Sequence, residues 1–112
     1  MSKYLILIFR DEDAEYTATG GEISPNYREF MDRRAGVLQG GAALESTATA
    51  TSIRSDGAGG FVVTDGPFAE SKEALGGYYV IEAADLDEAL EIAKEVPAPF
   101  GGVEVRPIRV AS

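Results

Sequence analysis

Residues 3–9 constrain the fold more than any other part of the chain, because Tyr4 begins a run of six consecutive apolar side chains. A strand that is apolar on both faces is typical of the centre of a covered sheet. The run is much shorter than the roughly 18 apolar residues of a membrane-spanning helix. It is also too short for a signal-peptide core, and Arg10 with three acidic residues follows it in place of a cleavage site. We therefore expect a cytoplasmic protein, not associated with a membrane, with this strand inside its sheet.

The composition excludes several kinds of chemistry. The 112 residues contain no His and no Cys, which rules out Ser-His-Asp and Cys-His catalysis, zinc fingers, iron–sulfur clusters and disulfides. With 19 acidic and 10 basic residues the formal net charge is −9, which argues against binding to nucleic acid or to anionic membranes. The length fits one domain, residues 1–112, for which we expect neither a cofactor nor a metal ion.

Gly and Pro residues that end helices and strands, together with the spacing of the apolar residues, divide the chain into about four or five strands and two helices. Ser24 followed by Pro25 is typical of a helix start, because Ser supplies a capping oxygen and Pro has no N–H to leave unpaired. Asp85 followed three residues later by Glu88 has the form of a capping box. We expect strands at residues 3–9, 47–54, 61–64, 78–82 and 103–108, helices at about 25–35 and 86–96, a loop at 10–22 and a break in the chain at Gly40-Gly41.

The order of these elements indicates an α+β fold, ferredoxin-like in plan, with an antiparallel sheet and two helices on one face. The strands at 47–54 and 61–64 would form a hairpin within that sheet. The face without helices would carry Tyr78 or Tyr79 together with Val62 or Val63. A partly apolar open face predicts self-association, most simply a two-fold dimer with its sheets packed together.

Two segments resemble ligand-binding loops only in part. Asp11, Asp13, Glu15 and Glu22 have the spacing of calcium-loop ligands, but Tyr16 stands where that loop needs Gly, so a solvated acidic loop is the simpler interpretation. The Gly-rich segment 57–60 lacks the Lys and the following helix of a phosphate-binding loop, and it fits a hairpin tip.

The segment that begins Thr-Asp-Gly-Pro-Phe combines a carboxylate, a rigid turn and an aromatic ring. Its turn could hold Asp65 at the edge of a cleft with Phe68 as an apolar wall. Asp65 or Glu70 could then act as a base, and Lys72 or Arg106 could hold an anion. The structural alternative is that Asp65 caps its own turn, Phe68 fills the core, and the charged residues are solvated.

The same segment resembles the signature of YCII-related proteins of the DGPF type, through Asp65-Gly66-Pro67-Phe68 and, downstream, Gly76-Gly77-Tyr78-Tyr79. The resemblance covers essentially the whole chain. It implies a ferredoxin-like fold, a homodimer with a dimeric α+β barrel-like assembly, a bacterial cytoplasm and a functional link to a sigma factor. Some relatives are thought to use a His-Asp pair, which this chain cannot form because it has no His.

Three functions remain open on these grounds. The interpretation we adopt is a small-molecule-binding or regulatory dimeric module with a pocket near the DGPF turn. The alternatives are a small lyase or isomerase with Asp65 as its base, which would need burial to act near neutral pH, and a purely structural dimer. The ligand-binding candidates are Asp65, Gly66, Pro67, Phe68, Glu70, Lys72, Tyr78 and Arg106.

Overall fold

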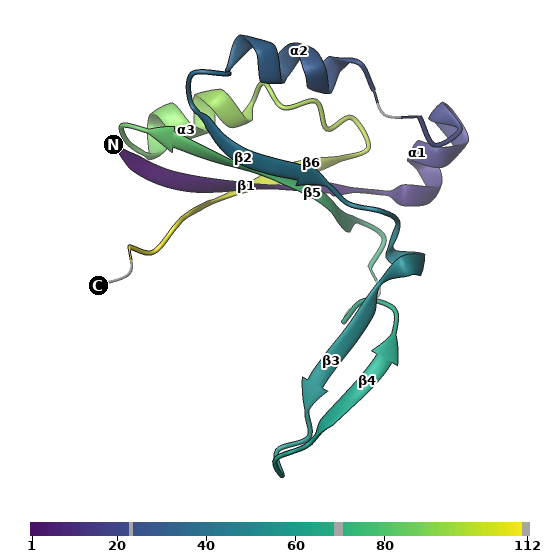
Figure 1. Cartoon of the computed structure of the whole chain (residues 1–112). Coiled ribbons are helices and arrows are strands. Elements are labelled where there is room, and N and C mark those ends of the chain that lie inside the picture. Colours follow the sequence, from purple (N-terminus) through teal and green to yellow (C-terminus); the bar gives the residue numbers. More distant parts are fainter. Residues whose placement is uncertain (23, 69–70, 111–112) are drawn as a thin grey trace.

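A computed structural model describes residues 1–22, 24–68 and 71–110, and its centre is a four-stranded sheet (Figure 1). Strand β1 (Ser2–Arg10) is an inner strand, as its apolar run predicts, and it pairs with β5 (Ala74–Ala83) and with β6 (Gly101–Pro107). Strand β2 (Leu38–Ala43) pairs with β5 and completes the order β2-β5-β1-β6, antiparallel throughout. The α+β class is confirmed, and this order is consistent with the ferredoxin-like plan.

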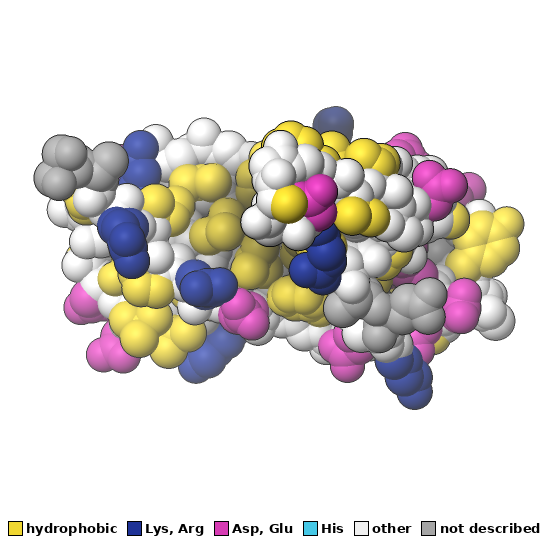
Figure 2. All heavy atoms as spheres, turned by 90° about the horizontal axis from the view of Figure 1, so that it is seen from below, with side chains coloured by type: hydrophobic (Ala, Val, Ile, Leu, Met, Phe, Trp, Pro, Cys, Tyr) yellow, Lys and Arg dark blue, Asp and Glu magenta, His cyan; other side chains and the backbone are white. Residues whose placement is uncertain are grey.

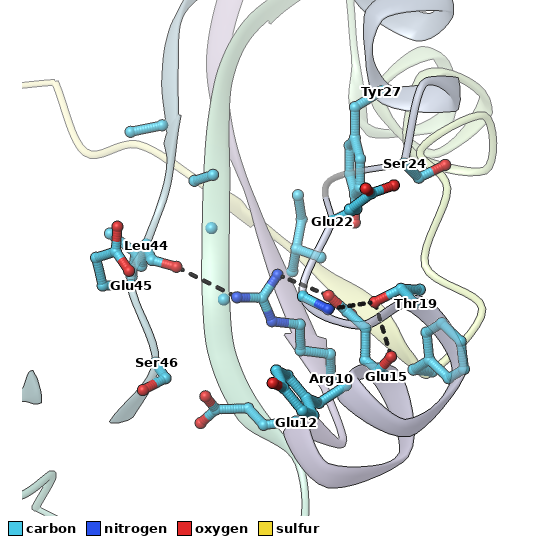
Figure 3. Close-up of a pocket in the computed structure, with 18 of the residues that line it drawn as sticks. Arg10, Glu12, Glu15, Thr19, Glu22, Ser24, Tyr27, Leu44, Glu45 and Ser46 are labelled. Atoms are coloured by element: carbon cyan, nitrogen blue, oxygen red, sulfur yellow. Dashed lines mark hydrogen bonds and ion pairs between the residues drawn. The ribbon is translucent and has the colours of Figure 1, made fainter. Parts of the chain in front are cut away.

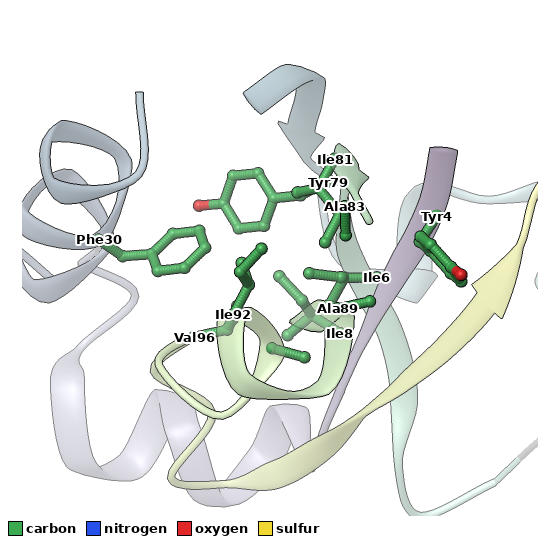
Figure 4. Close-up of a cluster of buried hydrophobic side chains, with 11 residues drawn as sticks. Tyr4, Ile6, Ile8, Phe30, Tyr79, Ile81, Ala83, Ala89, Ile92 and Val96 are labelled. Carbon is green, nitrogen blue, oxygen red and sulfur yellow. The ribbon is translucent and has the colours of Figure 1, made fainter. Parts of the chain in front are cut away.

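Helices α2 (Asn26–Arg33) and α3 (Leu86–Ala93) cover one face of the sheet (Figure 1). Helix α3 begins where the sequence predicts, with Asp85 accepting from the Glu88 N–H, whereas α2 begins one residue later than predicted, after Pro25, and Ser24 Oγ accepts from the Asn26 N–H. No helix in the described part of the chain is long and apolar enough to cross a membrane. The core between helices and sheet, drawn in Figure 4, consists of Tyr4, Ile6, Ile8, Phe30, Tyr79, Ile81, Ala83, Ala89, Ile92, Ala93 and Val96.

The opposite face of the sheet, which we term the open face, carries the alternate residues of the same strands. Tyr79 is buried under the helices, so Tyr78 lies on the open face, where it is partly exposed. The cross-strand pairs there are Lys3 with Glu82, Leu5 with Val80 and Arg106, and Leu7 with Tyr78 and Glu104. Figure 2 shows apolar side chains on this side of the molecule with charged ones around them. The predicted division between Tyr78 and Tyr79 is confirmed.

The predicted hairpin exists, but it lies outside the main sheet. Strands β3 (Thr51–Ser55) and β4 (Phe61–Asp65) form a separate two-stranded sheet that projects from the open-face side (Figure 1). The expectation that Val62 or Val63 shares a sheet face with Tyr78 was therefore wrong. The first strand also begins later than predicted, because residues Thr47–Thr49 form a 3-10 turn, η1.

Two further predictions were wrong in the first half of the chain. The acidic segment predicted as a loop contains a third helix, α1 (Glu12–Thr19), with Asp11 accepting from the Ala14 N–H at its start and Gly20 left-handed at its end. Its acidic first turn is favoured by the helix dipole. Gly40 and Gly41 do not break the chain but lie within the edge strand β2, next to a bulge.

Candidate functional site

A cavity of about 1040 Å³ lies between α1, the start of α2, and the ends of β2 and β5 (Figure 3). The segment that follows β2, from Leu44 to η1, forms another of its walls. The volume is that of a pocket for a small organic molecule. The cavity is thus built by segments that are far apart in the sequence.

Arg10 occupies the middle of this cavity. Its side chain is 22% exposed, its Nη1 lies 3.3 Å from Glu15 Oε1, and its Nη2 donates to the Leu44 carbonyl at 3.2 Å (Figure 3). It also lies close against Gly76, since a methyl group there would be 2.6 Å from Arg10 Nε. A guanidinium has five N–H donors, so this arrangement leaves donors for a ligand. Arg10 is therefore positioned by contacts from the segment after β2, from α1 and from β5.

Glu12 closes one end of the site by joining α1 to η1. Its carboxylate accepts from Thr47 Oγ1 at 2.6 Å and from the Thr47 N–H at 3.1 and 3.2 Å. Charge-assisted hydrogen bonds of this kind are stronger than those between neutral groups. They therefore fix the spacing between α1 and η1, which form two walls of the cavity.

Three tyrosines line the cavity: Tyr16 of α1 is exposed, whereas Tyr27 is half-buried and Tyr79 is buried. Burial raises the pKa of Tyr27, and the negative charge of Glu15 raises it further. The positive charge of Arg10 acts in the opposite direction and lowers it. Burial and the neighbouring Tyr27 raise the pKa of Tyr79. The Tyr79 ring also packs on Phe30, with 5.1 Å between the ring centres. The phenols of Tyr27 and Tyr79 therefore keep their protons at neutral pH and can donate hydrogen bonds into the site.

The charge around the cavity is mainly negative. Among the described lining residues, Arg10 is the single basic side chain. Five acidic side chains also line the cavity, of which three are exposed (Asp13, Glu22 and Glu45) and two are partly buried (Glu12 and Glu15). No cluster of acidic side chains within the described ranges has the arrangement needed for a metal ion. An organic ligand that is neutral or positively charged fits this surface better than an anion.

The DGPF turn lies elsewhere, at the base of the hairpin. The Gly66 N–H donates to the Ala50 carbonyl at 2.8 Å, and Ser52 Oγ donates to the Gly66 carbonyl at 2.6 Å. Phe68 is exposed, and Arg54 lies 4.4 Å from the centre of its ring. These contacts join the turn to β3. The alternative that Phe68 fills the core was wrong.

The other sequence-derived candidates are dispersed. Asp65 and Pro67 are exposed at the hairpin base, Lys72 is exposed just before β5, and Tyr78 and Arg106 lie on the open face. Glu70 lies outside the described residues. None of the seven candidates that the structure describes is among the residues that line the cavity.

The residues that do converge there are Arg10, Glu15 and Tyr27, and sequence reasoning missed them. One signal was present, a single Arg at the end of a buried apolar strand. The Leu44 carbonyl that it contacts is 34 positions away along the chain, and no local pattern connects the two.

Two comparisons with known proteins give matches over nearly the whole chain. The YCII-related domain family matches residues 2–112. A curated protein of Rhizobium meliloti (strain 1021), named "Uncharacterized protein R00369", is 36% identical over 115 residues, an alignment that covers 94% of this chain and 90% of that protein.

Proposed function

The chain belongs to the YCII-related domain family, and on that basis we propose that it is a dimeric small-molecule-binding module whose ligand occupies the cavity around Arg10. The observation that carries the proposal is the placement of Arg10, a partly buried cation held by Glu15 and the Leu44 carbonyl inside a cavity of about 1040 Å³. Such a group, with donors to spare, is typical of a polar anchor in a mainly apolar pocket.

The same contacts define the ligand class. Glu15 already neutralises much of the Arg10 charge, and the exposed acids at the rim repel anions. A ligand with an apolar body and a neutral group such as an amide can accept from Arg10 and donate to Glu15. An amine can pair with the exposed acids of the rim, Asp13, Glu22 and Glu45, while Arg10 stays in place. We therefore propose a neutral or cationic organic ligand.

The dimeric part of the proposal concerns the open face. Leu5, Leu7, Tyr78 and Val80 form an apolar strip there that the helices do not cover. Around the strip, Lys3 and Arg106 balance Glu82 and Glu104, whereas the whole chain carries a net charge of −9. A second copy can approach this face without the repulsion that the rest of the surface exerts.

An enzymatic function with Asp65 as the base has less support. Asp65 is exposed at the end of β4, so it lacks the burial that would adapt a carboxylate to proton transfer near neutral pH. The contacts of the DGPF turn favour a structural role at the hairpin base.

The test uses three compounds with one ring and different charges, namely benzamide, benzylamine and benzoate. Each is titrated into the isotope-labelled chain, and binding is followed through the amide signals of Leu44 and Gly76. We expect benzamide and benzylamine to shift these signals and benzoate to bind at least about tenfold more weakly. Arg10→Gln should abolish the benzamide response, while Arg109→Gln, which removes an exposed charge outside the cavity, should keep it.

Two results would contradict the proposal. One is preferential binding of benzoate, which would reverse the charge argument. The other is a set of shifts that is confined to the hairpin or the open face, or that is unchanged in Arg10→Gln.

A further inference from the structure

The β3–β4 hairpin is amphipathic. In its register Ile53 lies opposite Val63 and Ser55 opposite Phe61, so the three apolar side chains share one face. They are 58%, 63% and 72% exposed. The other face carries Ser52 opposite Thr64 and Arg54 opposite Val62. The first face also carries Thr51 opposite Asp65 at the hairpin base, so its apolar part is the outer portion formed by Ile53, Phe61 and Val63.

This apolar face needs a partner. An isolated two-stranded hairpin is marginally stable at best in water. Three large apolar side chains, each more than half exposed, receive little cover from the described residues of their own chain. The polar face, by contrast, is occupied by the chain itself, through the contact of Arg54 with the ring of Phe68. The hydrogen bonds at the base close the hairpin on itself, between residues 50–52 and Gly66.

The hairpin projects from the side of the molecule that the open face occupies (Figures 1 and 2). Packed sheets lie about 10 Å apart, and a strand of five residues is roughly 17 Å long. A second copy seated on the open face therefore comes within reach of the hairpin. The hairpin is long enough to pass the edge of the partner's sheet and to lie against its side.

The size of the open face supports a second copy that uses both surfaces. Four strands of about eight residues give a planar footprint of roughly 500 Å². A stable interface needs about 800 Å² from each partner. Two hairpins related by a two-fold axis would supply the missing contact, one from each copy.

We propose that each hairpin is an arm that packs the face of Ile53, Phe61 and Val63 against a second copy of this chain docked on the open face. This inference rests on the proposed dimer and adds a second contact to it. The occupant is a copy of the chain because the charge-balanced open face and the hairpin with its exposed apolar side chains lie on the same side of the molecule.

The first test measures the dimer dissociation constant of the full chain by sedimentation equilibrium. Val63→Ser alters the apolar face, and Val62→Ser is the matched control on the opposite face of the same strand. We expect Val63→Ser to raise the dissociation constant at least about tenfold, since both copies lose the contact, and Val62→Ser to change it by less than about threefold. Equal effects of the two variants would overturn the arm.

A second measurement does not depend on variant stability. The chain has no Cys, so Ala58→Cys at the hairpin tip gives a unique attachment point for a spin label. In mixed dimers of labelled chains and isotope-labelled wild type, we expect broadening of amide signals along one side of the partner. A dimer without such broadening overturns the arm and leaves the face-to-face dimer intact. A wild-type chain that stays monomeric at millimolar concentration overturns both, while ligand binding at Arg10 is unaffected.

Discussion

Arg34 forms a two-point ion pair with Glu95, with its Nη2 donating to Oε2 at 2.5 Å and its Nε donating to Oε1 at 3.1 Å. Arg33 Nε also donates to Oε1, at 2.9 Å. The hydrogen bonds from Arg34, and then those from Arg33, lower the pKa of Glu95 to about 2. The pair joins the end of α2 to the residues after α3. It therefore holds the two covering helices together over the sheet.

The first prediction concerns pH. Because the pKa of Glu95 in the folded chain is about 2, below its ordinary value of 4.5, the ion pair stabilises the fold above about pH 4.5. That stabilisation is lost as the pH falls toward about 2. We expect Glu95→Gln to lower the urea midpoint at pH 7 and to match wild type near pH 2. The control is Glu29→Gln, which removes an exposed carboxylate from α2. A Glu95→Gln deficit that stays constant with pH would contradict the assignment.

A second prediction tests the contact between Arg10 and Gly76. Gly76→Ala places a methyl group 2.6 Å from Arg10 Nε, and the flexible Arg side chain has to move. We expect weaker benzamide binding, by several-fold, with little change in the melting temperature. Gly102→Ala is the control, because a methyl group there meets nothing within 4 Å. Undiminished binding in Gly76→Ala would show that the position of Arg10 does not matter.

The third prediction concerns the core under α2. Phe30 is fully buried against Tyr79, so Phe30→Ala should destabilise the fold by about 3–5 kcal/mol. Its neighbour Met31 is 40% exposed, and Met31→Ala should cost no more than about 1 kcal/mol. Urea unfolding of both variants gives the comparison. Similar losses in the two would mean that α2 does not face the sheet as described.

The fourth prediction separates the hairpin from the core. Gly66 has φ of 100°, a left-handed conformation that a side chain strains, so Gly66→Ala should loosen the hairpin base. We expect faster hydrogen exchange at β3 and β4 amides and unchanged exchange at β1 and β5. Gly36→Ala is the control, since its φ is not in that region and its surroundings are open. Accelerated exchange throughout the sheet would contradict a local role.

The sequence allowed prediction of those parts of the fold that depend on local pattern. The apolar run at residues 3–9 predicted a central strand, and the alternation at Tyr78 and Tyr79 predicted which positions face opposite sides. The capping residue Asp85 placed the start of α3. Within that helix, Leu86 and Leu90 are 48% and 39% exposed, whereas Ile92 is buried.

The parts that failed depend on distant partners. Gly41 lies in β2, where that strand comes very close to β5. A methyl group at this position would lie 2.6 Å from the Tyr78 carbonyl oxygen, so the position requires Gly. The hairpin was recognised, but nothing in its alternating pattern states which sheet it joins. The cavity forms only when Arg10 contacts Leu44 and Glu15 in the folded chain. The DGPF turn is the most distinctive local motif, and it predicted a pocket at a different position.

The position of the hairpin along the chain has a consequence for how relatives of this protein can diverge. It is inserted between β2 and β5, two adjacent antiparallel strands that a short turn would also connect. The entropy cost of such an insertion grows only with the logarithm of its length. Relatives can therefore carry a longer, shorter or different hairpin at this position without any change in the strand order of the main sheet.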